Sequence, residues 1–173
     1  VLTPNDQIAF AEHWGELIPF PYGSLPGYPN IIELRNRGKS RDVNQHWHSD
    51  MTYDPVPPKL TMLYALEAPA IGGETAFANQ VLAYQELSIG MKALVDSLIA
   101  KHSAKDLARL YGQDPEQASE AEHPAVRTHD ETGERALYVC RAFTRQFRDW
   151  SRQESKVLLD YLYEHCVRPE YQA

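Results

Sequence analysis

A histidine and an aspartate two residues apart, His48 and Asp50, are the feature that most constrains this chain. On an extended strand, residues i and i+2 point to the same face, so one imidazole and one carboxylate can converge on a single metal ion. They supply two of the three ligands of the facial triad that holds non-haem Fe(II) in oxygenases. The pair therefore predicts a metal-binding strand, and a second histidine is needed to complete the triad.

The bare tripeptide leaves other interpretations open. An exposed polar strand edge would have the same pattern, and His46 shares the alternation with His48 and Asp50. A zinc-binding, cupin-like protein or hydrolase could use all three side chains, and a non-catalytic scaffold could use none of them. A short strand can hardly wrap three consecutive same-face residues around one octahedral face. We therefore expect His46 to support the ligands or to face solvent.

Composition excludes several classes of partner. The formal net charge of −7 and the lack of a Lys/Arg block argue against a nucleic-acid or anionic-membrane surface. No apolar run is long enough to span a bilayer. Cys140 and Cys166 are expected to remain thiols in a reducing, cytoplasmic compartment.

Local signals predict an α+β, mainly β chain. Thr3 and Pro4 indicate the start of a helix, and Ser151 with Glu154 forms a capping box before another. Asp130 to Gly133 is typical of a hairpin turn between strands 126–128 and 136–140. The other expected elements are strands at 31–35, 60–66 and 75–78, helices at 80–88 and 91–102, and irregular loops at 19–29 and 113–122. The strand at 60–66 is expected to be buried on both faces.

Several longer motifs occur in an informative order. The residues concerned are 46–53 (HWHSDMTY), 65–69 (ALEAP), 72–79 (GGETAFAN), 83–88 (AYQELS), 123–129 (HPAVRTH), 136–139 (ALYV) and 142–144 (AFT). Together they resemble the TauD/TfdA family of Fe(II)/2-oxoglutarate-dependent dioxygenases. The resemblance covers nearly the whole chain. It implies a double-stranded β-helix, a jelly-roll relative, with flanking helices and incomplete in this chain.

The resemblance also implies roles for particular residues. His48 and Asp50 match the first two iron ligands, and the third histidine is expected beyond Ala173, together with an arginine for 2-oxoglutarate. Thr75 matches a threonine that helps to hold a carboxylate of 2-oxoglutarate. Asn44, Met51 and Phe143 match positions that line the substrate pocket.

The expected protein is an enzyme that uses O₂ and 2-oxoglutarate to hydroxylate a small organic acid, with release of succinate and CO₂. A sulfonate, a sulfate ester or an aryloxyalkanoate fits the family. Phe20 stands where taurine-type members carry a sulfonate-binding histidine, so taurine is not expected to be the best substrate. We interpret residues 1–173 as one partial domain, truncated at both ends, of a homo-oligomeric enzyme.

Overall fold

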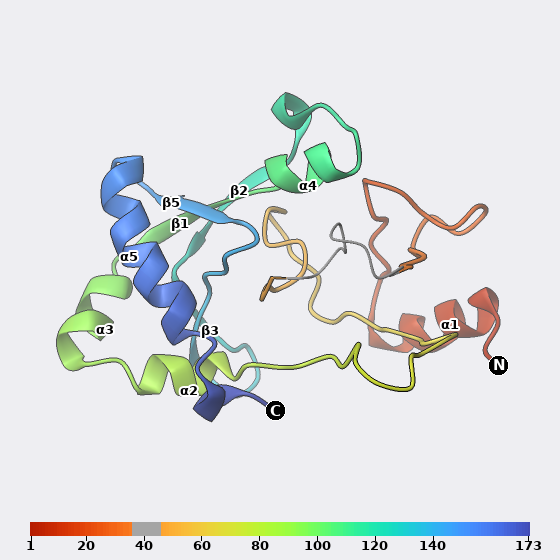
Figure 1. Cartoon of the computed structure of the whole chain (residues 1–173), viewed down its shortest axis with the longest axis horizontal. Coiled ribbons are helices and arrows are strands. Elements are labelled where there is room, and N and C mark those ends of the chain that lie inside the picture. Colours follow the sequence, from red (N-terminus) through yellow and green to blue (C-terminus); the bar gives the residue numbers. More distant parts are fainter. Residues whose placement is uncertain (36–45) are drawn as a thin grey trace.

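The computed structural model describes residues 1–35 and 46–173, and its regular structure is concentrated in the second half of the chain (Figure 1). Helix α1 (Pro4–Ala11) and the 3-10 turn η1 (Glu12–Trp14) stand apart at the N-terminal end. The remaining elements are α2 (Gln80–Gln85), α3 (Ile89–Val95), β1 (Ile99–Ser103), α4 (Lys105–Leu110), η2 (Pro115–Gln117), β2 (Glu120–Pro124), β3 (Val126–Thr128), β4 (Arg135–Leu137), β5 (Thr144–Phe147), α5 (Arg152–His165) and η3 (Pro169–Tyr171).

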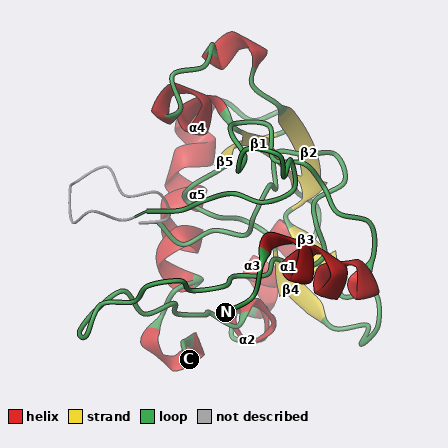
Figure 2. Cartoon of the chain, turned by 90° about the vertical axis from the view of Figure 1, so that its right-hand side faces the viewer, coloured by secondary structure: helices red, strands yellow, loops and turns green. Residues whose placement is uncertain are grey.

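The strands form two small antiparallel sheets. One has the order β2-β1-β5, and the other pairs β3 with β4 in the predicted hairpin. In the larger sheet Ala100 pairs with His123 and His102 with Ala121, and the register with β5 shifts between Lys101 and His102. Figure 2 shows the long helix α5 running beside this sheet. Its buried face consists of Ser155, Leu158, Leu159, Leu162 and His165.

The main apolar core lies between Ala83 and Tyr171. Its fully buried members include Val95, Ala100, Phe147 and Leu162, drawn from α3, β1, β5 and α5. A smaller cluster of Tyr53, Ala104, Cys140 and Phe143 lies under the segment that carries His48 and Asp50. Most of the buried residues that pack under the candidate site therefore come from parts of the chain that follow it in sequence.

Capping signals predicted the helix starts correctly. The Thr3 hydroxyl accepts a hydrogen bond from the Asp6 N–H, and the Ser151 hydroxyl accepts one from the Glu154 N–H. Both form complete capping boxes. Cys140 and Cys166 are buried free thiols, as expected. The loop at 19–29 is also irregular as expected.

Several predicted elements were wrong because pairing between distant segments decides strands. Residues 99–102, assigned to the end of a helix over 91–102, belong to β1, which lies between two partner strands. The two helices expected at 80–88 and 91–102 are present as the shorter α2 and α3, and the predicted loop at 113–122 contains η2 and the start of β2. The expected strands at 31–35 and 75–78 are extended without a ladder, apart from a single bridge between Ala78 and Gln172.

The apolar segment 60–66 is the largest departure from expectation. It forms no strand, it pairs with no described strand, and Leu60, Leu63 and Leu66 are 58%, 66% and 73% exposed. None of the described helices has the length and apolar character needed to cross a membrane.

Candidate metal centre

His48 and Asp50 do not lie on the expected strand. Residues 47–49 belong to no helix or strand, and a turn begins at Asp50 in which the Asp54 N–H donates to the Met51 carbonyl at 2.9 Å. Met51 has a φ of 49°, in the left-handed region. The two side chains nevertheless converge, with His48 Nε2 3.1 Å from Asp50 Oδ1. The start of the turn brings the two side chains together, which the alternation of a strand was expected to do.

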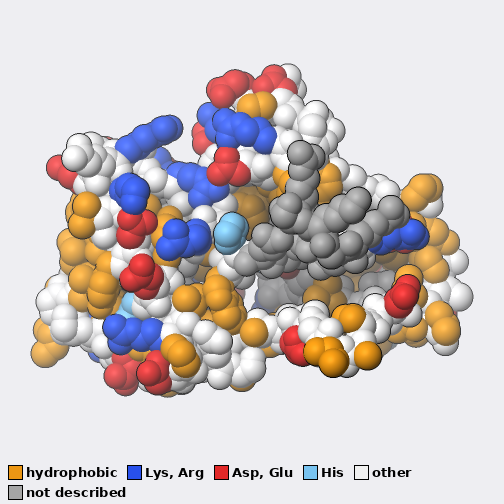
Figure 3. Space-filling view, viewed as in Figure 1, with side chains coloured by type: hydrophobic (Ala, Val, Ile, Leu, Met, Phe, Trp, Pro, Cys, Tyr) orange, Lys and Arg blue, Asp and Glu red, His pale blue; other side chains and the backbone are white. Residues whose placement is uncertain are grey.

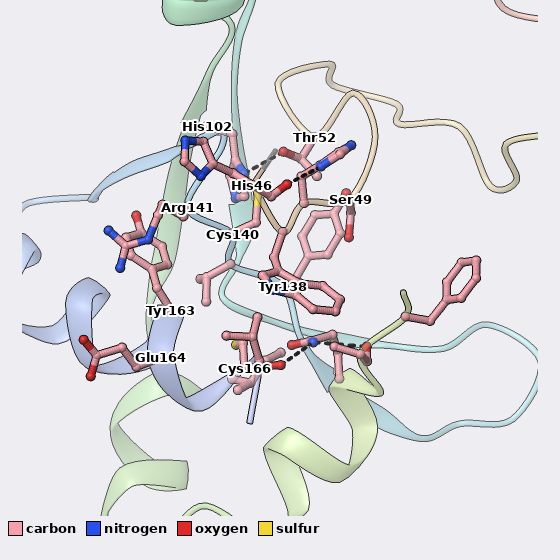
Figure 4. A pocket seen from close by; sticks show the side chains of 18 of the residues that line it. His46, Ser49, Thr52, His102, Tyr138, Cys140, Arg141, Tyr163, Glu164 and Cys166 are labelled. Carbon is pink, nitrogen blue, oxygen red and sulfur yellow. Dashed lines mark hydrogen bonds between the residues drawn. The ribbon is translucent and has the colours of Figure 1, made fainter. Parts of the chain in front are cut away.

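The tautomer of His48 is fixed by its own segment. His48 Nδ1 lies 2.6 Å from the His46 carbonyl oxygen, which can only accept, so Nδ1 carries a hydrogen and donates it (Figure 4). In the neutral ring Nε2 then presents a lone pair to the Asp50 carboxylate. Two acceptors this close require a proton or a metal cation between them.

The electrostatics agree with such a pair. The hydrogen bond that His48 donates to the Asp50 carboxylate raises the pKa of His48, and the same bond lowers the pKa of Asp50 below its usual value. A proton therefore takes the place that a metal would compete for. Imidazole and carboxylate donors in this arrangement fit a divalent ion such as Fe(II).

Neighbouring groups hold both donors in place. Asp50 Oδ2 accepts a hydrogen bond from the Thr61 hydroxyl at 2.7 Å, which leaves Oδ1 for a metal. The edge of the His48 ring meets the Phe143 ring at 6.0 Å between centroids and an interplanar angle of 86°. The side chains of His48 and Asp50 are 18% and 44% exposed, so the donors are supported on one side and open on the other.

No third protein ligand is found within residues 1–35 and 46–173: no His, Cys, Asp or Glu side chain joins this pair in a three-residue group. His46 is exposed and contributes its main-chain carbonyl, not its ring. The alternative of a zinc site built from His46, His48 and Asp50 is therefore wrong.

The other predicted site residues have different outcomes. Phe143 is buried and contacts His48. Its ring packs edge-on against that of Tyr53, with the two ring centroids 5.0 Å apart. Met51 packs against this same small cluster. Thr75 is exposed, and the structure does not bring it to the pair, although its neighbour Ala76 lines the adjacent cavity. Asn44 lies outside the described residues.

A cavity of about 370 Å³ adjoins His48. One wall is the segment from His46 to Thr52, and the other includes Tyr138, Arg141 and Tyr163 (Figure 4). The walls also contain His102, which sequence reasoning assigned to a helix and did not place near the site. Its recognition required the pairing of β1 with β2 and β5, and no local signal in 99–103 supplies that pairing.

Taken with this donor pair, the comparisons with known proteins define the class. The family model described as taurine catabolism dioxygenase TauD, TfdA family, matches residues 1–173. The chain belongs to this family.

Two curated relatives illustrate the likeness. A sulfate ester dioxygenase of Pseudomonas putida that depends on α-ketoglutarate (2-oxoglutarate) is 32% identical, over 98% of this chain and 60% of its own length. The (S)-phenoxypropionate/α-ketoglutarate dioxygenase of Sphingobium herbicidovorans is 31% identical, over 97% of this chain and 64% of its own length. The chain therefore spans about three fifths of these relatives.

Solved structures agree with the sequence matches. A taurine dioxygenase from Burkholderia xenovorans superposes with a TM-score of 0.74 and 31% identity, over 99% of this chain and 58% of that one. AAD-2 in complex with Mn(II) and N-oxalylglycine superposes with a TM-score of 0.76 and 27% identity, over 99% of this chain and 63% of that one. The expected fold class is confirmed: the chain carries part of the double-stranded β-helix of this family, with flanking helices.

Proposed function

We propose that the complete protein is an Fe(II)- and 2-oxoglutarate-dependent dioxygenase, with His48 and Asp50 as two ligands of the metal. The observation that carries this proposal is the 3.1 Å approach of His48 Nε2 to Asp50 Oδ1, with Nδ1 already engaged by a carbonyl. Membership of the TauD/TfdA family supports it. A third histidine and a 2-oxoglutarate-binding arginine are expected from beyond Ala173.

The residues of this chain would hold and orient the reactants. When bound, Fe(II) supplies the redox chemistry that couples conversion of 2-oxoglutarate and O₂ into succinate and CO₂ with hydroxylation of a substrate C–H bond. His48 offers Nε2 because the His46 carbonyl holds Nδ1–H, and Asp50 offers Oδ1 because Thr61 holds Oδ2. Phe143 packs against the imidazole in a T-shaped arrangement and helps to orient it.

The proposed substrate is a small organic acid: a sulfonate, a sulfate ester or an aryloxyalkanoate, but not taurine as the best one. The names of the relatives support these classes, and Phe20 at the position of the taurine-binding histidine argues against taurine. We further propose that Thr75 contacts 2-oxoglutarate and that Asn44, Met51 and Phe143 line the substrate pocket.

The remaining proposals concern the setting of the enzyme. Residues 1–173 are proposed to be part of a single dioxygenase domain in a cytoplasmic homo-oligomer, with O₂ and small molecules as its partners. On the face shown in Figure 3, Lys and Arg side chains alternate with Asp and Glu, which gives no support to a nucleic-acid surface there.

The test compares three alanine variants of the complete protein. His48→Ala and Asp50→Ala should abolish Fe(II)-dependent succinate formation, because each removes a metal donor. His46→Ala should keep most of the metal affinity, because alanine retains the carbonyl that holds His48. Loss of metal binding in His46→Ala alone, with turnover preserved in the other two variants, would refute the assignment.

A further inference from the structure

The segment that carries the metal donors is anchored to the larger sheet by two histidines. The Thr52 hydroxyl lies 2.9 Å from His102 Nδ1, and His123 Nε2 lies 3.0 Å from the Asp54 carbonyl oxygen, to which it donates. Thr52 and Tyr53 are each only 1% exposed. The turn that begins at Asp50 is thus fixed against β1 through Thr52 and against β2 through Asp54, although this segment belongs to no sheet.

These histidines share one face of the sheet. Because Ala100 pairs with His123 and His102 with Ala121, the two imidazoles are diagonal neighbours, and their ring centroids are 5.4 Å apart. The Tyr138 ring lies 5.7 Å from His102 and 5.5 Å from His123. The three rings pack together on the face of the sheet that the donor segment contacts.

The Thr52–His102 contact extends to β5. His102 is 1% exposed, and burial lowers its pKa to about 3, so its ring is neutral. Its Nδ1 also lies 3.3 Å from the Thr144 hydroxyl, which accepts a hydrogen bond from the Cys140 N–H at 2.9 Å. Figure 4 shows Thr52 and His102 joined by this bond at the edge of the cavity. One buried ring therefore ties the donor segment to two distant parts of the fold.

We propose that Thr52 and His102 are positioning residues for the metal, an inference that rests on the proposed function. Only Met51 separates Thr52 from Asp50, and its φ of 49° is unfavourable for a residue with a side chain. That conformation persists because the residues around it are held. If the hydroxyl of Thr52 is lost, Met51 can relax, and the Asp50 carboxylate then moves away from His48 Nε2.

Paired variants of the complete protein test this role, with Co(II) as the metal probe. Thr52→Val keeps the shape but loses the hydroxyl, whereas Thr52→Ser keeps the hydroxyl. Likewise His102→Leu loses the ring nitrogen, whereas His102→Asn places an amide near the Nδ1 position. We expect Thr52→Val and His102→Leu to weaken Co(II) binding about ten-fold or more and to alter the visible spectrum of bound Co(II). Thr52→Ser and His102→Asn should stay close to the unaltered protein.

Ser155→Ala is the matched control for lost stability. Ser155 is fully buried and its hydroxyl accepts a hydrogen bond from the Phe147 N–H, outside the residues that line the cavity or hold the donors. It should lower the melting temperature as Thr52→Val does, with Co(II) affinity unchanged. Thermal melts establish that each variant is folded, and the two pairs can be judged independently.

The outcomes separate the two proposals. Unchanged Co(II) affinity and spectrum in folded Thr52→Val and His102→Leu would overturn the positioning role while leaving the proposed function intact. An equal loss in Ser155→Ala would also overturn it, because general destabilisation would then explain the effect. Absence of Co(II) binding and of 2-oxoglutarate turnover in the unaltered protein would remove the proposed function and the positioning role together.

Discussion

At the scale of single residues, the sequence singled out a histidine and an aspartate whose side chains converge, but not the groups that orient them. The spacing of His48 and Asp50 and the motifs around them are local, so they can be read from the chain. Thr61 bonds to Asp50 across 11 residues, and His102 bonds to Thr52 across 50 residues, and no sequence spacing encodes such contacts. The prediction that His46 is not a ligand stays a prediction; the contact that it makes with His48 is through its carbonyl, not its ring.

Burial of His102 should make stability depend on pH in a particular direction. In the unfolded chain its pKa returns to about 6.5, whereas in the fold it is about 3. Between these values the unfolded state binds the proton and the native state does not, so the free energy of unfolding falls as the pH falls. The contribution is about 1.4 kcal/mol per pH unit at most, and it ends near pH 3, where the folded ring also protonates.

Urea unfolding at several pH values measures this effect. His102→Asn lacks the titration, so the stability of the unaltered protein should approach that of the variant on going from pH 7 to pH 4. Carboxylates titrate in both proteins and cancel in the comparison. A difference in free energy that stays constant over this range would show that His102 is not held neutral by the fold.

At the scale of elements, predictability followed the range of the interactions involved. Capping boxes and the hairpin turn depend on residues within a few positions, and both were predicted correctly. Strand β1 was not, because its apolar pattern fits a helix and only pairing with β2 and β5 makes it a strand. The prediction of a buried strand at 60–66 was wrong for the opposite reason. The segment has the composition of a buried strand, but it has no described partner strand.

The two capping boxes should differ in what their loss costs. Helix α5 buries five residues against the core, whereas no residue of α1 is buried. Ser151→Ala should therefore lower the global free energy of unfolding by about 1 kcal/mol, because the cap is coupled to core packing. Thr3→Ala removes an equivalent cap but should only fray α1, with little change in global stability. Urea unfolding monitored by circular dichroism compares the two variants, and equal losses would contradict this account.

At the scale of the whole molecule, buried apolar packing is unevenly distributed along the chain. Every member of the main buried cluster lies between Ala83 and Tyr171. Residues 77–79 join this unit through backbone bonds to 171–173, including Asn79 N–H to the Tyr171 carbonyl at 2.8 Å. The preceding segment, 60–76, has no member of this cluster and exposes Leu60, Leu63 and Leu66.

This uneven burial predicts where a protease cuts the chain of residues 1–173. Chymotrypsin prefers large apolar residues, and Leu60, Leu63, Leu66 and Phe77 are all more than half exposed on an extended backbone. Local unfolding is hardly needed there, whereas Leu158 and Leu162 become accessible only when the core opens. Brief digestion followed by mass spectrometry should therefore give a resistant product that begins near residue 78 and extends to the C-terminal end.

Urea-unfolded chain, digested in parallel, should be cut throughout. Early cleavage within α5, with 60–77 intact, would show that the buried cluster is not the stable unit. Since 60–77 also carries Thr61, which holds Asp50, protection of this segment in a longer polypeptide would link completion of the domain to assembly of the metal centre.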